Sequence, residues 1–218
     1  MGITALLFVG GPADLPADFL GYREQADIVI CVDSGAVSAA SLSLIPDHLI
    51  GDLDSVPVDL LAKYQDCGVD IHRYPARKNE TDLELAMNLA LAKEAGTMYL
   101  INSLGGRWDM SLANILLTAQ KKYAAIAVFH VGATCVMRIL HPGRHEICNR
   151  SGQLISLLPL EGEVTGINLS GFEYPLANET LPFGSTRGVS NRIINTLAAI
   201  ELQTGILLCI EQGEENPT

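Results

Sequence analysis

Almost continuous apolar runs divide the first half of the chain and end in turn-forming residues. They occupy residues 3–9, 27–32, 48–50, 69–74 and 97–101. Between them, apolar residues recur at helical spacing, at positions 83, 87, 90 and 91 and again at 112, 115, 116 and 119. Buried strands that alternate with amphipathic helices predict a parallel sheet covered on both faces.

The pattern changes after about residue 124. Short apolar or alternating segments follow at residues 126–131, 135–140, 153–158, 164–169 and 206–210, with turn residues between them and no helical spacing. Closely spaced strands of this kind predict a small antiparallel sandwich or barrel. We therefore expect an α/β domain with a parallel sheet over residues 1–130 and an all-β sandwich domain over residues 131–218. The boundary itself is expected within residues 125–140.

The composition is that of a globular chain with an acidic balance. Of its 218 residues, 48% are apolar and 18% are charged, and the net charge is −11. A general nucleic-acid binder needs a basic face, so nucleic acid is not an expected partner. An anionic substrate would have to be captured locally, by backbone amides, a few cations or a metal.

The five cysteines are odd in number and widely scattered. No C-x-x-C pair occurs, which argues against a zinc site or a disulfide framework and favours a reducing compartment. The start of the chain has no basic region of the kind that opens a signal peptide, and no apolar run approaches transmembrane length. We expect a cytoplasmic location and no membrane partner.

Residues 51–55, Gly-Asp-Leu-Asp-Ser, follow the third apolar run and form the most informative motif. They place Asp52 and Asp54 two residues apart in a polar segment. Closely spaced carboxylates are the oxygen ligands that a hard cation such as Mg²⁺ selects. Taken alone the motif also fits an ordinary acidic turn, because Asp, Gly and Ser are common turn residues.

Further polar clusters follow the other runs. Ligands bind at the carboxyl ends of parallel strands, so we expect these clusters to converge on one rim. Each also has a plain structural explanation: Thr81 and Glu84 form a capping box, and Asp33 and Asp109 are possible helix caps. The clusters comprise Asp33, Ser34 and Gly35; Lys78, Thr81 and Asp82; and Gly105, Gly106, Arg107 and Asp109.

Together these residues predict a metal–nucleotide site. Asp52, Asp54 and Asp82 can hold Mg²⁺, while Lys78, Arg107 and glycine amides can hold phosphate oxygens. No Walker-type phosphate loop occurs. Such a site suits phosphoryl-type transfer, in which positioning and charge neutralisation supply most of the catalysis.

In their order and spacing these motifs resemble the thiamine pyrophosphokinase family, and residues 171–176 and 188–191 resemble its C-terminal motifs. The resemblance implies a homodimer whose active site lies where the subunits meet. It also implies transfer of the pyrophosphoryl group of Mg-ATP to the hydroxyl of thiamine, giving thiamine diphosphate and AMP. ATP and thiamine are then the small-molecule partners, and Mg²⁺ is the cofactor.

The resemblance also assigns roles to residues. It makes Asp52, Asp54 and Asp82 the metal-binding and catalytic residues, and Ser190 and Asn191 the thiamine-binding residues. The ATP-binding residues would be Asp33, Ser34, Gly35, Lys78, Thr81, Gly105, Gly106, Arg107 and Asp109. The base that takes the hydroxyl proton stays open, with Asp54 and Asp82 as candidates.

Three positions depart from the family pattern. Met110 stands where the family usually has His, and Met cannot donate a hydrogen bond to a phosphate. Arg192 stands where an acidic residue is common, and Trp108 is the only tryptophan, so no indole of the second domain can stack on thiamine. Alternative functions are a pyrophosphokinase for another alcohol such as a hydroxymethylpterin, a Mg²⁺-dependent nucleotide hydrolase, or a non-catalytic nucleotide or thiamine sensor.

Overall fold

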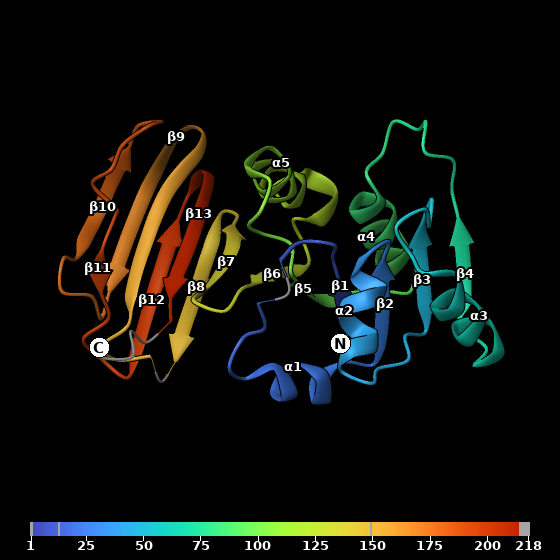
Figure 1. The fold of residues 1–218 in the computed structure, drawn as a ribbon. Helices are drawn as coiled ribbons and strands as arrows, with labels where there is room; N and C mark the ends of the chain where they lie inside the picture. Colours follow the sequence, from blue (N-terminus) through green and yellow to red (C-terminus); the bar gives the residue numbers. More distant parts are fainter. Residues whose placement is uncertain (1, 13, 149, 214–218) are drawn as a thin grey trace. The chain divides into compact units, whose positions relative to one another are not determined.

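The computed structural model describes residues 2–12, 14–148 and 150–213. The chain divides into two compact units, residues 1–133 and 134–218 (Figure 1). Each unit has its own apolar core.

The first unit is an α/β domain built on a parallel sheet. Its strands lie in the order β4-β3-β2-β1-β5-β6, and every neighbouring pair is parallel. The strands are β1 (Ile3–Phe8), β2 (Ile28–Val32), β3 (His48–Gly51), β4 (Asp70–Arg73), β5 (Ala95–Ile101) and β6 (Ala127–Val131). The helices are α1 (Phe19–Gln25), α2 (Gly35–Ser41), α3 (Val58–Asp66), α4 (Asp82–Ala92) and α5 (Trp108–Thr118), followed by the 3-10 helix η1 (Lys121–Tyr123).

Helix α4 forms where the apolar spacing predicts it, and Leu83, Met87 and Ala90 are buried in the core beside the sheet. Its start is capped by Thr81, whose Oγ1 accepts a hydrogen bond from the Glu84 backbone N–H at 3.2 Å. The carboxylate of Glu84 binds Lys122 Nζ at 2.7 Å. The predicted capping box is therefore seen in its Thr81 half, and Glu84 ties the helix to η1.

Residues 126–131 were expected among the antiparallel strands, and that expectation is wrong. They form β6, which pairs in parallel with β5, with Met98 opposite Val128. The reason is that α5 and η1 lie between the two strands and supply the crossover that a parallel pair needs. The sequence of these six apolar-rich residues does not by itself show whether they join the parallel sheet or the antiparallel strands.

The second unit is the expected antiparallel sandwich. The start of β9 pairs with β13 and β11, and β13 pairs with β7. The end of β9 pairs with β10 and β12, and β12 pairs with β8. The strands are β7 (Cys135–Leu140), β8 (Gly143–Cys148), β9 (Leu154–Ser170), β10 (Leu176–Leu181), β11 (Asn191–Arg192), β12 (Leu197–Leu202) and β13 (Thr204–Gln212).

Residues 153–158 and 164–169 were expected as separate strands, but they belong to the single long strand β9. Leu158 pairs with Leu208 of β13, whereas Leu169 pairs with Ile200 of β12. Gly162 and Gly166 lie between these pairings with φ values of 58° and 66°. Gly162, a turn residue between the two predicted strands, and Gly166 instead let one strand pass from the first sheet to the second.

Helix α5 also forms as predicted, but its apolar stripe is not its buried face. Leu112 and Leu116 are exposed, whereas Ser111, Asn114 and Thr118 are buried. The polar residues face the site described below. In the part of the chain that is described, the helices are too short or too polar to cross a bilayer.

Candidate functional site

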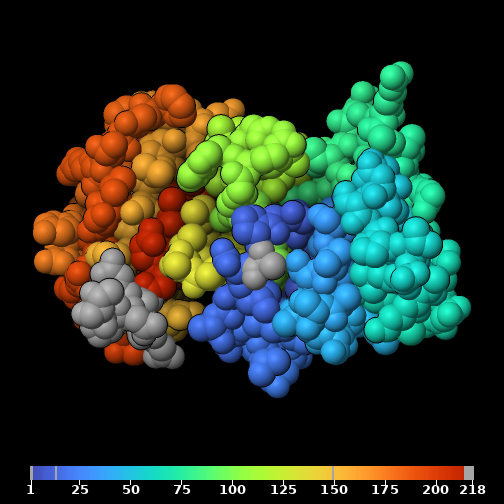
Figure 2. Space-filling model, in the orientation of Figure 1, coloured from blue at the N-terminus to red at the C-terminus, as the bar shows by residue number. Residues whose placement is uncertain are grey.

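A cavity of about 760 Å³ lies at the carboxyl ends of the parallel strands. Segments that follow β1, β2, β3 and β5 line it, together with the starts of α4 and α5. The segment between β4 and α4, which projects from the surface of the unit, adds Ala76, Lys78, Glu80 and Thr81 (Figure 2). The expected convergence of the polar clusters on one rim is therefore present.

Three carboxylates gather at the ends of β2 and β3. Single oxygen atoms of Asp33, Asp52 and Asp54 lie within 4.8 Å of one another. Asp33 Oδ1 is buried and has no hydrogen-bond partner among the described residues. An oxygen-only group with an unused buried acceptor fits a hard divalent cation. The sequence motifs predict Asp52 and Asp54 for this role, whereas they predict Asp33 among the nucleotide-binding residues.

Burial and neighbouring groups both act on the pKa of Asp33. Burial raises the pKa of Asp33, and the negative charges of Asp52 and Asp82 raise it further, while hydrogen bonds with Ser55 and Ser34 act in the opposite direction. The ionised form of Asp33 is therefore costly in this position. A bound cation would remove that cost.

The backbone is left-handed where these strands end. The φ values are 46° at Asp33, 65° at Leu53 and 57° at Asn102, which follow β2, β3 and β5. Each such residue costs about 1–3 kcal/mol and persists only where the surrounding structure enforces it. Three of them on one rim mark the rim as a place where side-chain direction is constrained.

Asp82, the third predicted metal ligand, lines the same cavity but has a different partner. Its Oδ1 lies 2.9 Å from Lys78 Nζ, and both side chains are largely buried. Lys78 also donates to the Pro75 carbonyl at 3.2 Å. Asp82 is thus the first residue of α4 and an ion-paired carboxylate, and its negative charge raises the pKa of Asp33.

The glycine turn after β5 approaches the cavity with φ values of 93° at Gly105 and 68° at Gly106, which non-glycine residues rarely adopt. The Gly105 N–H donates to Ser111 Oγ at 2.9 Å. At the start of α2, a Cβ at Gly35 would lie 2.1 Å from the Phe8 carbonyl oxygen, so only glycine lets α2 begin this close to β1.

Arg107, which lines the cavity, binds Asp109, and both side chains are exposed. Arg107 donates from Nε to Asp109 Oδ1 at 3.1 Å and from Nη2 to Asp109 Oδ2. These hydrogen bonds raise the pKa of Arg107 and lower that of Asp109. The sequence makes Asp109 a possible N-cap, but Arg107 occupies the cap position and Asp109 lies in the first turn of α5.

The structure also contains a buried polar group that the sequence did not indicate, and two of its members, Ser103 and Asn114, line the cavity. Asn114 Nδ2 donates to the Ser103 carbonyl at 2.7 Å, and Ser103 Oγ lies 2.9 Å from His130 Nδ1. The other ring nitrogen of His130 lies 3.2 Å from Thr118 Oγ1. Burial lowers the pKa of His130 to about 4, so the ring is neutral at pH 7. The polar spacing of residues 111, 114 and 118 on α5 was the signal that could have found this group.

The sequence also did not indicate Asn102, whose side-chain hydrogen-bonding groups are unsatisfied. Its side chain is buried in the cavity wall, and neither Oδ1 nor Nδ2 has a hydrogen-bond partner among the described residues. A buried amide with unused donor and acceptor groups costs stability unless a ligand or water satisfies it. Asn102 is therefore suited to contact a polar ligand.

The second unit has a smaller cavity of about 340 Å³, lined in part by Glu173, Tyr174 and Asn191. The side chain of Asn191 accepts hydrogen bonds from the backbone N–H of Tyr174 and Arg192 and donates to the Tyr174 carbonyl at 2.7 Å. Ser190 is exposed beside it, with a φ of 59°. Asn191 thus fixes the loop that carries Tyr174.

Comparison with known proteins gives a consistent result. A family model described as thiamin pyrophosphokinase, catalytic domain, matches residues 19–130, and one described as thiamin pyrophosphokinase, vitamin B1 binding domain, matches residues 144–207. The thiamine pyrophosphokinase of Bacillus subtilis (strain 168) is 30% identical over 212 residues, which span 97% of this chain and 99% of the relative.

Solved structures agree with the sequence match. The thiamine pyrophosphokinase structure from Bacillus subtilis superposes with a TM-score of 0.87 at 28% identity, covering 97% of this chain and 100% of that one. The one from Geobacillus thermodenitrificans gives 0.86 at 28% identity, covering 98% and 99%.

Proposed function

The chain belongs to the thiamine pyrophosphokinase family, and from this membership we propose that it transfers the pyrophosphoryl group of ATP to the hydroxyl oxygen of thiamine, giving thiamine diphosphate and AMP. The observation that carries the proposal is the cavity at the strand ends. Carboxylates, a lysine and a glycine turn all line it. That combination suits a metal-bound polyphosphate.

We propose that Asp33, Asp52 and Asp54 hold Mg²⁺. Their mutual distances and the unpartnered Asp33 Oδ1 support this assignment. When bound, the cation neutralises charge on phosphate oxygens. Asp82 remains a predicted ligand and catalytic residue. It would become available once an incoming phosphate draws Lys78 away from it.

The remaining nucleotide-side residues are proposed to orient the polyphosphate. Lys78 would exchange Asp82 for a phosphate oxygen, and Arg107 would exchange Asp109 in the same way, because both cations already line the cavity. Thr81 caps α4 and so fixes Asp82. Ser34, Gly35, Gly105 and Gly106 would let backbone amides approach the nucleotide.

Thiamine is a cationic, aromatic alcohol, and we propose that the second unit binds it. The carboxylate of Glu173 and the ring of Tyr174 suit its charge and its rings. Asn191 would act by holding Tyr174 in place, and the exposed Ser190 would contact the substrate directly. The alcohol oxygen then attacks the β-phosphorus, the bond from that phosphorus to the oxygen shared with the α-phosphate breaks, and AMP leaves. Asp54 or Asp82 is the candidate that takes the proton of the alcohol.

We also propose that the enzyme is a homodimer with its active site where the subunits meet. Trp108, Leu112 and Leu116 support this, because they form an exposed apolar stripe at every fourth residue of α5. The five cysteines are all free, which supports a reducing, cytoplasmic location.

One comparison separates this function from its alternatives. The protein is incubated with ATP and Mg²⁺ in three mixtures, containing thiamine, a hydroxymethylpterin or no acceptor alcohol. AMP release that needs thiamine supports the proposal. Equal AMP release without an acceptor identifies a hydrolase, release only with the pterin identifies a different pyrophosphokinase, and ATP binding without any AMP identifies a sensor.

A further inference from the structure

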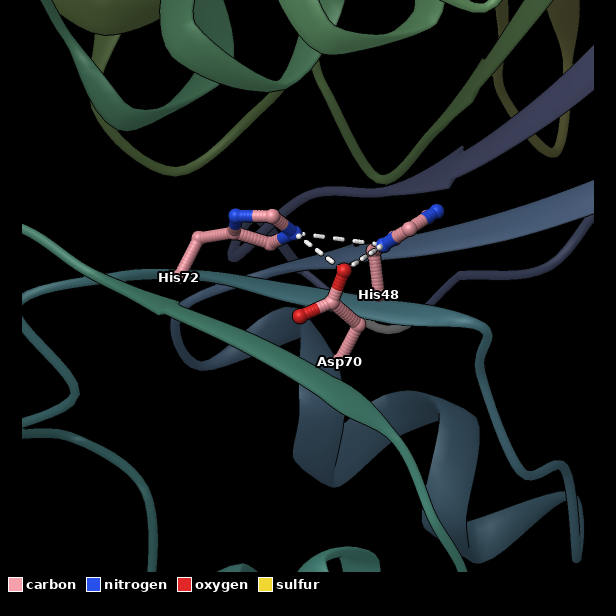
Figure 3. Close-up of side chains that lie close together, drawn as sticks. All are labelled: His48, Asp70 and His72. Atoms are coloured by element: carbon pink, nitrogen blue, oxygen red, sulfur yellow. Dashed lines mark hydrogen bonds and ion pairs between the residues drawn. The ribbon is translucent and has the colours of Figure 1, made fainter.

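Two histidines and an aspartate meet on the edge of the parallel sheet, away from the cavity residues. His48 lies on β3, and Asp70 and His72 lie on the edge strand β4. In the register of this parallel pair His48 is opposite Asp70, and Ile50 is opposite His72. Because side chains two residues apart lie on the same face of a strand, all three polar side chains project from one face of the sheet. Figure 3 shows their polar ends pointing toward one another.

The three polar atoms form a nearly equilateral triangle. His72 Nε2 lies 3.2 Å from both His48 Nδ1 and Asp70 Oδ2, and the latter two atoms are 3.4 Å apart. A tetrahedral zinc ion with bonds of about 2.0–2.1 Å requires its ligand atoms to lie roughly 3.3–3.4 Å apart. The triangle therefore has the dimensions of one face of a zinc tetrahedron, and the fourth corner is left for water.

The surroundings keep these groups available as ligands. His48 is buried, so the packing around its ring limits the rotamers open to it. Asp70 remains 62% exposed, so an ion can reach the triangle from solvent. Two imidazoles and one carboxylate favour a borderline transition metal over Mg²⁺, which prefers oxygen ligands only.

From this geometry we propose that His48 Nδ1, Asp70 Oδ2 and His72 Nε2 bind a divalent first-row transition metal such as Zn²⁺. The site is separate from the Asp33, Asp52 and Asp54 cluster. It ties the edge strand β4 to β3 just before the turn that carries Asp52. The absence of C-x-x-C pairs in the sequence argues against a cysteine-based zinc site, but the site proposed here uses no cysteine.

The test uses the full-length protein, treated with a chelator and then freed of it. Zn²⁺ alone is added, and binding is measured by competition with a chromophoric chelator. We expect Asp70→Asn and His72→Gln each to lower the affinity for one equivalent of Zn²⁺ at least 10-fold. His145→Gln is the matched control, since it removes a histidine from β8, and it should bind as the unmodified protein does.

X-ray absorption at the zinc edge identifies the ligands independently. Two imidazole nitrogens with only nitrogen and oxygen in the first shell support the proposal, whereas sulfur ligands would assign the ion to cysteines such as Cys67 or Cys148 and overturn it. Affinity unchanged in both Asp70→Asn and His72→Gln would also overturn it, because the trio would then be a hydrogen-bonded cluster only. Asp70→Asn keeps the test decisive if His72→Gln fails to fold, because the Asp70 side chain is largely exposed.

Discussion

Lys78 Nζ lies 2.9 Å from Asp82 Oδ1, so the lysine predicted to hold a phosphate and the carboxylate predicted to hold a metal neutralise each other in the structure. The two residues are four positions apart: Lys78 lies in the loop after β4, and Asp82 is the first residue of α4. Both side chains line the cavity. If ATP binds here, Lys78 would exchange its contact with Asp82 for one with a phosphate oxygen. Asp82 would then be free to bind a metal, so nucleotide binding and metal binding would be coupled through this pair.

Replacing Lys78 by Gln should raise the KM for ATP about 10-fold or more, because a hydrogen bond to a charged group contributes roughly 1.5–3 kcal/mol. Steady-state kinetics with ATP varied at saturating thiamine measures the effect. Lys63→Gln, on the exposed side of α3, is the matched control and should leave the KM unchanged. An unchanged KM in Lys78→Gln would remove Lys78 from the phosphate site.

Asp54→Asn should lower kcat at least 100-fold while leaving the fold intact, because Asp54 is exposed and its proposed role is to bind the cation. Activity is measured over a range of Mg²⁺ concentrations, and thermal unfolding reports the fold. Asp59→Asn removes a nearby exposed carboxylate from α3 and should behave as the unmodified protein. Near-normal turnover in Asp54→Asn would show that the metal assignment is wrong.

Asn191→Ala should raise the KM for thiamine and lower the stability of the second unit, with little effect on the KM for ATP. The substitution leaves the backbone N–H and carbonyl of Tyr174 without their partner. Both hydrogen bonds are part-buried, so each loss should cost less than the roughly 1–3 kcal/mol expected for a fully buried group. Ser190→Ala should raise the KM for thiamine without loss of stability. Asn195→Ala, at an exposed position nearby, is the control. Equal effects on both substrates would argue against a thiamine-side role.

His130 should make the first unit sensitive to acid. Burial lowers its pKa to about 4, below the ordinary value of 6.5, so the folded state favours the neutral ring. The resulting stability is fully present above pH 6.5 and is lost as the pH falls toward 4, by about 3 kcal/mol in all. Urea unfolding between pH 7 and 4 should show a shallower loss in His130→Gln. Parallel curves for the two proteins would contradict this.

The sequence predicted the strands and the strand-end clusters because both depend on local pattern. Asp52 and Asp54 could be found because they follow a buried run within a few residues. The sequence could not place Asp33 beside Asp52 and Asp54. That proximity depends on the pairing of β2 with β3 and on a left-handed residue at the end of β2.

Long-range pairing also explains the errors in the fold. Gly162 indicates a turn in any local reading, but in β9 it bends a strand that has partners in two sheets. Leu112 and Leu116 define a helix without saying which face is buried, and the structure buries Asn114 instead. Asn114 and Asn102 were missed because their importance comes from the cavity that they line.

The most direct measurement follows the phosphate groups themselves. The protein is incubated with Mg²⁺, thiamine and ATP labelled at the γ-phosphate, and the products are separated and counted. The account predicts that the label appears in thiamine diphosphate and that AMP forms in equal amount, since the β- and γ-phosphates move together. Formation of ADP, or AMP release that does not depend on thiamine, would contradict it.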